Sequence, residues 1–401
     1  MKVLRRILLA LLGLVIAGLI GAKWFVGAIN VPLIAAEVGS KGLAARLQVP
    51  VGFQFSVFAS DVPNARVLRF TKMGDLLVSN PGNDRVLLLT RDQNGDGQYD
   101  SKKVLLDKKR VPDFKDPNGI DFYQDNRQQD WLYVAESESI GRIKFDHNKG
   151  EVIGKYERII TGLPGGGNHW KKTLRFGADG WLYVAMGSSC NVCVEKDKRR
   201  ASIVRYQPDG SGEEIYATGL RNSEGFDWNV QGELYATDNG RDLLGDDFPP
   251  CELNRIVRAG FYGWPFTNGN KIKDPDYGAN RDAEIASSLA PVHGFNAHNA
   301  PLGMTFIHHT NMPDEYRSAA FVALHGSWNR SKKDGYKVVS LHWQSDGKII
   351  EKDFLSGFLK DDNVIGRPAD VVEGTDGAIY ISDDFAGAIY RVAYHPGSGS
   401  L

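Results

Sequence analysis

Short apolar segments separated by glycine and aspartate turns recur along the chain after residue 50. In each repeat one apolar segment precedes such a turn and a second segment, often of the type Leu-Tyr-Val-Ala, follows it, as at 174–176 and 181–185. The second segments are centred near residues 77, 133, 183, 235, 322 and 380. Short apolar runs bounded by turn residues are typical of β-strands, and helical periodicity is nearly absent beyond residue 50. The pattern therefore predicts an all-β chain.

The spacing of the repeats indicates a six-bladed β-propeller. Most second segments lie about 50 to 60 residues apart, which is enough chain for a four-stranded blade. A single small sheet cannot bury both of its faces, whereas a radial stack of six sheets hides them. We expect the segment 53–58 to complete the last blade, which spans about 369–394, and the stretch 250–300 to be an inserted loop. Because the fifth repeat is the weakest, a five-bladed ring with an irregular insert is the alternative.

The N-terminal residues have the pattern of a secretory signal or a membrane anchor. Lys2, Arg5 and Arg6 precede the uncharged run 7–22, and further apolar residues extend it to position 29. Both interpretations place the rest of the chain outside the cytoplasm, in the periplasm, secreted, or attached through residues 7–29 to the outer face of the inner membrane. The predicted organisation is a signal peptide or anchor (1–22), a linker (23–50), the propeller (51–394) and a C-terminal tail (395–401).

Charge and cysteine content narrow the function classes. The chain has 48 Lys and Arg against 49 Asp and Glu, so no basic face suggests a nucleic-acid partner. In an oxidising compartment Cys190 and Cys193 are expected to form a disulfide, which leaves Cys251 free. A thioredoxin-like redox site would need a βαβ context, and a zinc site would need a fourth ligand at suitable spacing. The cysteine pair is therefore expected to be structural.

Loops between the predicted strands hold the candidate catalytic residues, because propellers bind ligands at one mouth of the central channel. The stretch 165–170, Gly-Gly-Gly-Asn-His-Trp, offers His169 as a general base, with a satisfied structural histidine as the alternative. The equivalent loop of the fourth blade carries Arg221 and Asn222, which could polarise a developing oxyanion. A surface salt-bridge arginine is the other interpretation of Arg221.

Three further stretches have a composition suited to binding. Carboxylates and amides crowd the segment 237–254, which favours a hard cation such as calcium over a merely solvated acidic loop. The aromatic cluster 261–265, which contains Tyr262, fits core packing as well as ligand stacking. Arg330 and Arg367 are expected at equivalent blade positions, where together they could bind a polyanion.

A separate segment, Asp92–Asp100, matches the first half of an EF-hand loop. Its twelfth position is Lys103 instead of glutamate, and no helices flank it. We interpret it as a hairpin turn, and weak calcium binding there is left open.

The candidate stretches, in this order, resemble the quinoprotein sugar dehydrogenases, which comprise the soluble glucose dehydrogenases and the L-sorbosone dehydrogenase group. The likeness covers about residues 51–394, and the Gly-Ser-Ser-Cys-Asn-Val-Cys element at 187–193 resembles the sorbosone branch. No G-x-S-x-G elbow, P-loop, dinucleotide fingerprint or H-E-x-x-H motif competes with this assignment. The resemblance implies pyrroloquinoline quinone (PQQ) and Ca²⁺ as cofactors. It also implies oxidation of a sugar or sugar-derived aldehyde or alcohol by hydride transfer to the quinone, with an external electron acceptor.

The resemblance also implies a catalytic group and its neighbours. His169 would take the proton from the substrate hydroxyl, and Arg221 with Asn222 would stabilise the quinone oxygen that becomes anionic. Asn168 stands where the glucose enzymes have an acid that orients the histidine, so glucose itself is a less expected substrate.

Further positions are implied to bind the cofactors. The backbone carbonyls of Gly240 and Arg241 would hold the calcium ion, although Arg241 replaces a proline of the family. The resemblance assigns the remaining roles as follows: Glu252 and Tyr262 help a neighbouring calcium site, Arg330 and Arg367 pair with PQQ carboxylates, and Asp383 or Asp384 fills a polar position on the last blade. Cys251 stands where the sorbosone branch is expected to have an acid.

Two other functions remain as alternatives. In a calcium-dependent lactonase on the same fold, acidic and amide side chains from several blades would bind one central cation. A non-catalytic binding propeller would keep the fold without the cofactor, because this fold serves many functions. The concentration of acids in one loop favours the dehydrogenase over the lactonase.

Overall fold

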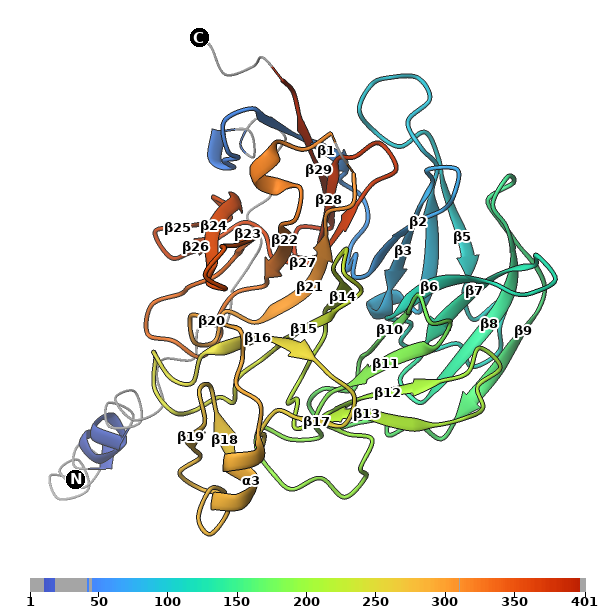
Figure 1. The fold of residues 1–401 in the computed structure, drawn as a ribbon. Coiled ribbons are helices and arrows are strands. Elements are labelled where there is room, and N and C mark those ends of the chain that lie inside the picture. Colours follow the sequence, from blue (N-terminus) through green and yellow to red (C-terminus); the bar gives the residue numbers. More distant parts are fainter. Residues whose placement is uncertain (1–10, 19–41, 43–44, 310, 397–401) are drawn as a thin grey trace, which may run out of the picture.

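A computed structural model describes residues 11–18, 42, 45–309 and 311–396 of the chain. Six sheets are arranged radially around a common axis (Figure 1). Within the described residues after 50, the one α-helix is the short α3 (Asp282–Ser287). The predicted all-β, six-bladed propeller is confirmed, and the five-bladed alternative is wrong.

The N-terminal segment is described only in part. Residues 11–18 are helical, and the rest of 7–29 lies outside the described residues. In the part of the chain that the structure describes, no helix combines the length and the apolar character needed to cross a bilayer. The assignment of residues 7–29 as a signal or an anchor stays a prediction.

Each blade is a four-stranded sheet with antiparallel neighbours. The first blade contains β2 (Leu68–Phe70), β3 (Leu76–Asn80), β4 (Arg85–Leu89) and β5 (Lys102–Leu106), and the second contains β6 (Ile120–Gln124), β7 (Asp130–Ala135), β8 (Ser139–Asp146) and β9 (Glu151–Thr161). The third contains β10 (Lys172–Phe176), β11 (Leu182–Met186), β12 (Ser202–Tyr206) and β13 (Glu214–Thr218), and the fourth contains β14 (Phe226–Trp228), β15 (Leu234–Asp238), β16 (Cys251–Ile256) and β20 (His293–Phe295). The fifth contains β21 (Pro301–Phe306), β22 (Ala320–Leu324), β23 (Lys337–Trp343) and β24 (Ile349–Leu355), and the sixth contains β27 (Pro368–Glu373), β28 (Ile379–Asp383), β29 (Ala388–Tyr394) and β1 (Phe53–Ala59).

The second strand of each blade is the sequence marker of its repeat. All residues of β3, β11, β15, β22 and β28 are buried, because each blade is covered on both faces by its neighbours. These strands therefore read as continuous apolar runs and not as alternating ones. The fourth strands face solvent, and β9 accordingly exposes most of its residues.

The ring is closed by the N-terminal strand, as predicted. β1 pairs antiparallel with β29, with Phe53 opposite Tyr394. The Phe53 ring also lies 5.2 Å from Phe354 on β24 and 5.1 Å from Tyr316, so it packs the last blade against the fifth. The closure thus joins the two ends of the propeller through main-chain hydrogen bonds and aromatic packing.

The acid-rich stretch 237–254 is only partly a loop, which corrects one expectation. Residues 251–254 belong to β16, so the connection from β15 to β16 is 239–250. The insertion therefore begins after β16 instead of at residue 250. It contains β17 (Gly260–Phe261), the hairpin of β18 (Thr267–Asn268) and β19 (Ile272–Lys273), and α3. β17 adds a parallel fifth strand to the third blade.

Short elements complete the described fold. They are the 3-10 turns η1 (Pro81–Asn83) and η2 (Asp314–Tyr316) and the two-stranded sheet of β25 (Leu359–Lys360) and β26 (Asn363–Val364).

The innermost strands form a layer of polar side chains near the axis, five of them charged. Its members come one from each blade: Arg69, Asp121, Arg175, Asp227, Thr305 and Asp370. Arg175 pairs with Asp227 at 2.8 Å, and Arg69 lies 3.7 Å from both Asp121 and Asp370.

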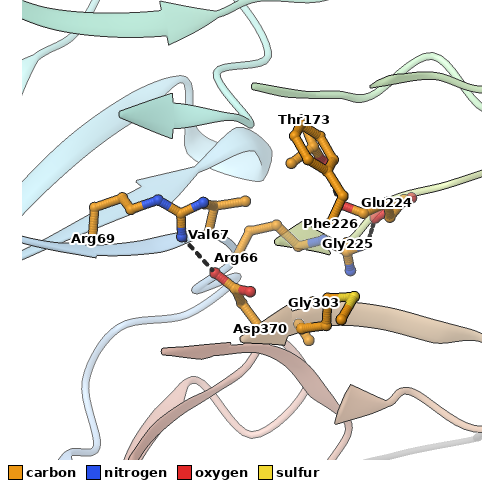
Figure 2. A pocket seen from close by; sticks show the side chains of 11 residues that line it. Arg66, Val67, Arg69, Thr173, Glu224, Gly225, Phe226, Gly303 and Asp370 are labelled. Carbon is orange, nitrogen blue, oxygen red and sulfur yellow. Dashed lines mark hydrogen bonds and ion pairs between the residues drawn. The ribbon is translucent and has the colours of Figure 1, made fainter. Parts of the chain in front are cut away.

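The three aspartates of this layer also join neighbouring blades. Asp121, Asp227 and Asp370 accept the main-chain N–H groups of Phe176, Phe306 and Leu68, at 2.8–2.9 Å. These contacts span the second and third, the fourth and fifth, and the sixth and first blades. Beside the layer a cavity of about 10 Å³ is left between Arg66, Arg69, Glu224 and Asp370 (Figure 2). That is room for about one water molecule, so the cavity is too small for a sugar or a larger ligand.

Loss of the Phe53 ring should weaken the closure. We expect Phe53→Ala to lower the free energy of unfolding by about 3–5 kcal/mol, because the side chain is buried and leaves a cavity between two blades. Chemical denaturation measures the change. Val51→Ala, at an exposed position just before β1, serves as the control and should change it by less than about 0.5 kcal/mol.

Candidate active site

The predicted catalytic loops meet at one mouth of the channel. In an antiparallel blade the start of the first strand, the end of the second and the start of the third lie at the same end of the sheet. The loops before β10, β14 and β27 and those after β11, β15, β22 and β28 therefore share one face. The loops at 165–170 and 219–225 both precede innermost strands, so their predicted equivalence is confirmed.

His169 is held in one tautomer by Ser188. Its Nδ1 lies 3.0 Å from the Ser188 carbonyl oxygen and 2.8 Å from the Ser188 hydroxyl oxygen. That hydroxyl donates its own hydrogen to the Cys190 carbonyl, at 2.8 Å. Since a carbonyl oxygen only accepts, Nδ1 carries a proton, and in the neutral imidazole Nε2 then holds a free lone pair. Within the described chain Nε2 has no hydrogen-bond partner, and it is not among the fully buried unpaired atoms, so it is open to an incoming molecule.

The electrostatic surroundings keep His169 neutral. Burial lowers its pKa to about 4, and the positive charge of Arg221 acts in the same direction. Glu224 and Asp242 oppose the shift. The same interactions place His169 close to the channel acids and to the acid-rich loop, as the base assignment requires. At neutral pH the imidazole can therefore accept a proton.

Arg221 is fixed by the loop that the disulfide closes. Cys190 and Cys193 are bonded as predicted, and Cys251 is free and buried. Arg221 donates from Nε to the Asn191 carbonyl at 2.8 Å and from Nη2 to the Asn191 side-chain oxygen at 2.9 Å. The disulfide loop thus contacts Arg221 through Asn191, and His169 through the Ser188–Cys190 hydrogen bond.

Asp238, at the end of β15, fixes the main chain of Arg221 and Asn222. Its carboxylate accepts the main-chain N–H groups of Arg221 at 2.8 Å and Asn222 at 2.5 Å. Gly187 lies between Asn222 and His169, and a Cβ at this position would come within 2.5 Å of both side chains. A glycine is required there for His169 and Asn222 to approach each other.

Two buried carboxyl groups at the edge of this site form no ion pair within the described chain. Asp238 and Glu252 face each other on β15 and β16. Burial raises the pKa of Glu252 to about 8, and the charge of Asp238 contributes to the shift. The Asn254 amide donates to Glu252 at 3.0 Å, while its side-chain oxygen is buried without a partner. Two carboxylates and one unpaired amide oxygen are the oxygen donors that Ca²⁺ prefers.

Of the other positions implied to bind calcium, the Gly240 carbonyl and the side chains of Arg241 and Tyr262 have partners of their own, and calcium binding by the Arg241 carbonyl stays a prediction. The Gly240 carbonyl accepts Arg221 Nη1 at 2.9 Å, and the Arg241 side chain turns to the insertion, where it pairs with Asp274 and Asp276 at 2.8 Å. The Tyr262 hydroxyl donates to the Arg255 carbonyl, near the opposite end of β16 from Glu252. The structure therefore does not bring the Tyr262 side chain to Glu252.

A chain of ion pairs crosses the mouth and includes Asp384. The guanidinium of Arg66 pairs with Glu224 and, at 2.6 Å, with Asp384, whose other oxygen lies 2.8 Å from His325 Nε2. Burial opposes ionisation, but His325 and Arg66 hold the pKa of Asp384 well below its usual range. Asp383 instead accepts main-chain N–H groups of its own turn, including Ala386 at 2.8 Å. Of these two aspartates, Asp384 is the one at the mouth.

Arg330 and Arg367 do not occupy equivalent blade positions, which corrects the expectation. Arg330 follows the second strand of the fifth blade, whereas Arg367 precedes the first strand of the sixth. Arg330 anchors the 239–250 loop through the Asp246 carbonyl and Asp247, 3.0 Å away. Arg367 donates to the His325 carbonyl at 3.1 Å.

Two cations of the mouth are held without a carboxylate of their own. Arg367 and Lys171 form no ion pair with the described residues, and Lys171 lies 4.7 Å from the Trp170 ring centroid. Burial lowers the pKa of both, and the charge of Arg66 contributes in each case. A bound anion would stabilise these charges.

The EF-hand-like segment closes on itself. The Asp92 carboxylate accepts the main-chain N–H groups of Gly95 and Gly97 at 2.7 Å, as in a turn. Calcium binding there stays a prediction.

Several residues that contact the candidate site were not identified from the sequence. Ser188 and Asn191 lie in the element at 187–193, which offered a signal but no role. Arg66 and Asp384 are 318 residues apart, so no local motif could pair them. Arg200 and Lys172, which hold the main chain around His169, had no signal at all.

Known proteins share both the sequence pattern and the fold. An uncharacterized protein of Borreliella burgdorferi is 32% identical over 377 residues, covering 89% of this chain and 93% of that protein. The aldose sugar dehydrogenase YliI of Escherichia coli is 24% identical over 324 residues, covering 72% of this chain and 76% of that enzyme.

Among solved structures, the holo PQQ domain of pyranose dehydrogenase from Coprinopsis cinerea has a TM-score of 0.72 at 20% identity, covering 86% of this chain and 97% of that one. The PQQ-bound aldose sugar dehydrogenase of Streptomyces coelicolor has a TM-score of 0.61 at 19% identity, covering 86% and 100%. These structures share the fold. The sequence profile described as glucose/sorbosone dehydrogenase matches residues 59–391. The chain belongs to the glucose/sorbosone dehydrogenase family.

Proposed function

We propose that this protein is a PQQ- and calcium-dependent dehydrogenase that oxidises a sugar or a sugar-derived aldehyde or alcohol. Family membership supports sugar dehydrogenase activity. The observation that carries the finer proposal is the neutral His169, whose Nε2 lone pair is open at a mouth with unpaired cations.

His169 is the general base of the proposed reaction. Nε2 takes the proton of the substrate hydroxyl, and Nδ1 stays protonated against Ser188 as the imidazolium forms. The low pKa keeps the base neutral at working pH. Glu224 and Asp242 are close enough to stabilise the imidazolium, because both raise the histidine pKa.

The cations of the mouth fit a polyanionic cofactor. Lys171 and Arg367 form no ion pair with the described residues, and they can bind PQQ carboxylates. Arg221 lies beside His169 and is paired with Asp242 at 2.9 Å, so it would act on a developing oxyanion through its charge and not through a free N–H group. When bound, PQQ supplies hydride acceptance and so carries both electrons of the oxidation. The protein supplies the base, the charge and the orientation.

Asp238, Glu252 and Asn254 are the side chains that fit a calcium ion. A cation there would displace the proton that burial favours on Glu252. It would also restrict the movement of the Asp238 carboxylate, which accepts the main-chain N–H groups of Arg221 and Asn222. The proposed role of calcium at this position is to support the cofactor-facing residues.

The lactonase alternative has little support in the described residues. The axial acids Glu224 and Asp384 are already paired with Arg66. In the described chain the one group of three Cys, His, Asp or Glu ligand atoms that converges is Cys190, Cys193 and Glu195, and its sulfurs form the disulfide. A central cation held by several blades therefore has no free set of acids.

Removal of the base should abolish turnover without loss of the cofactor. In dye-coupled assays with PQQ, Ca²⁺ and a panel of aldoses, osones and alcohols, we expect His169→Ala to lower kcat by about 10²–10⁴-fold. The exposed His308→Ala is the control and should leave kcat unchanged. Burial and Arg221 hold the pKa of His169 below the ordinary histidine value of 6.5. Because activity is lost when the base becomes protonated, the kcat/KM of the wild type should fall only below pH 6.5. Full turnover in His169→Ala, or lactone hydrolysis without PQQ, would contradict the proposal.

Cofactor binding should depend on the unpaired cations. We expect Arg367→Met to weaken PQQ binding by about 10-fold or more, the equivalent of one charge-assisted contact. Quenching of tryptophan fluorescence measures the affinity independently of activity. Arg391→Met removes a guanidinium that is paired with Asp376 on the same blade, and it should leave the affinity unchanged. Equal affinities in the two variants would remove the cofactor assignment of Arg367.

Calcium affinity should rise with pH. In the folded chain the pKa of Glu252 is about 8, above its ordinary value of 4.5. Without metal, protonated Glu252 therefore favours the folded state at low pH, and this contribution is lost as the pH rises toward 8. Since Ca²⁺ must displace this proton, we expect its affinity to increase up to about 10-fold per pH unit below 8. Thermal melting with EDTA or Ca²⁺ at pH 6 and 8 measures both effects. Glu252→Gln should melt higher than the wild type in EDTA at pH 8 and should lose the calcium-dependent shift; an undiminished shift would place the ion elsewhere.

A further inference from the structure

The loop that carries His169 has little structure of its own. Residues 164–170 form no strand or helix, and Gly166 and Gly167 adopt positive φ angles of 68° and 73°. Glycine-rich main chain loses more conformational entropy than any other when it is fixed. On its donor side, the loop is held by Asn168 N–H and His169 N–H, which bond the Ser189 and Ser188 carbonyls at 3.0 and 3.2 Å.

Arg200 holds the acceptor side of the same loop. Its Nη2 donates to the carbonyls of Gly165 at 2.6 Å and Gly166 at 2.7 Å. Its Nη1 donates to the carbonyls of His169 and Gly187, each at 3.1 Å. One planar guanidinium thus ties the loop, including the catalytic residue, to the end of β11.

Lys172 holds both ends of the loop. Its Nζ donates to the carbonyls of Pro164 and Trp170 at 2.9 Å, and to that of Ser137 in the second blade at 2.5 Å. Together the two cations bind five of the seven carbonyls between residues 164 and 170. The main-chain acceptors of the loop are therefore satisfied mostly by charged side chains.

The two cations are costly to bury, which argues against an incidental contact. Arg200 is 5% and Lys172 is 1% exposed, and neither forms an ion pair with the described carboxylates. Burial lowers the pKa of Lys172 to about 7, and the charge of Arg200 adds to the shift. By contrast, Arg205 on the same blade pairs with Asp179 and Glu214. Glu195 and Asp197 act on Arg200, and Glu138 acts on Lys172, from beyond ion-pair distance. Buried charged groups must be hydrogen-bonded, and here most of their partners are carbonyls of the loop.

We propose that Arg200 and Lys172 are positioning residues of the reaction, which clamp the main chain of 164–170 and so fix where His169 presents Nε2. The inference rests on the proposed function, in which His169 is the base. The clamp acts on the carbonyl side of the loop, while Ser188 fixes the ring itself. A loop freed from the clamp keeps the imidazole but not its position, and a misplacement of about 1 Å can cost about 100-fold in rate.

The test compares Arg200→Ala and Arg200→Lys with the control Arg205→Ala. Hydrogen–deuterium exchange of peptides covering 164–170 is measured on the full chain, and turnover on the PQQ- and Ca²⁺-loaded chain with its best sugar from the panel. For Arg200→Ala we expect exchange in 164–170 at least about 10-fold faster and kcat about 100-fold lower, with KM changed less than about 3-fold. Added guanidinium should restore at least about 10-fold of the lost kcat, and Arg200→Lys should lie between wild type and Arg200→Ala.

The outcomes separate the clamp from the proposed function. If the wild type oxidises no sugar but Arg200→Ala alone loosens 164–170, the clamp stands and the proposed function fails. Unchanged exchange in 164–170, or equal loosening in Arg205→Ala, would overturn the clamp. If Arg200→Ala does not fold, Arg200→Lys takes its place. Wild-type exchange in 164–170 together with wild-type kcat in a folded Arg200→Lys protein would also overturn the clamp.

Discussion

Charge pairing at the axis is the constraint on which the rest of the structure depends. Six innermost strands meet where water is nearly excluded, so every charge there needs a partner from another blade. Asp121, Asp227 and Asp370 meet this need by binding both an arginine and the main chain of the neighbouring blade. The same contacts join neighbouring blades and leave only a cavity of about 10 Å³ beside the axis.

The charges at the channel mouth are balanced differently from those of the axial layer. Above the paired layer, Arg66 is balanced by Glu224 and Asp384, whereas Lys171 and Arg367 form no ion pair in the described chain. The charges of Arg221, Glu224 and Asp242 act on His169, whose pKa is low because burial and Arg221 both disfavour its protonation. A neutral base next to unpaired cations suits proton removal from a substrate held near an anionic cofactor.

The sequence predicted the ring and singled out His169, but it did not predict the contacts that hold them. The buried second strands reveal the repeats because both of their faces are covered, and the loops before β10 and β14 were recognised from adjacent residues, Gly165–His169 and Arg221–Asn222. The pairing of Arg66 with Asp384 joins the two ends of the chain, and no periodicity encodes it. Arg330 and Arg367 were wrongly matched, because similar motifs fell on opposite sides of their strands.

The central claim, a neutral His169 with its proton on Nδ1, can be measured directly. Nitrogen-15 NMR of histidine-labelled protein at pH 7, with His169→Gln to assign the signals, distinguishes the two tautomers and the imidazolium. We expect a protonated Nδ1, an unprotonated Nε2 and no titration of this ring above pH 6. A proton on Nε2 at pH 7, or an imidazolium, would contradict it.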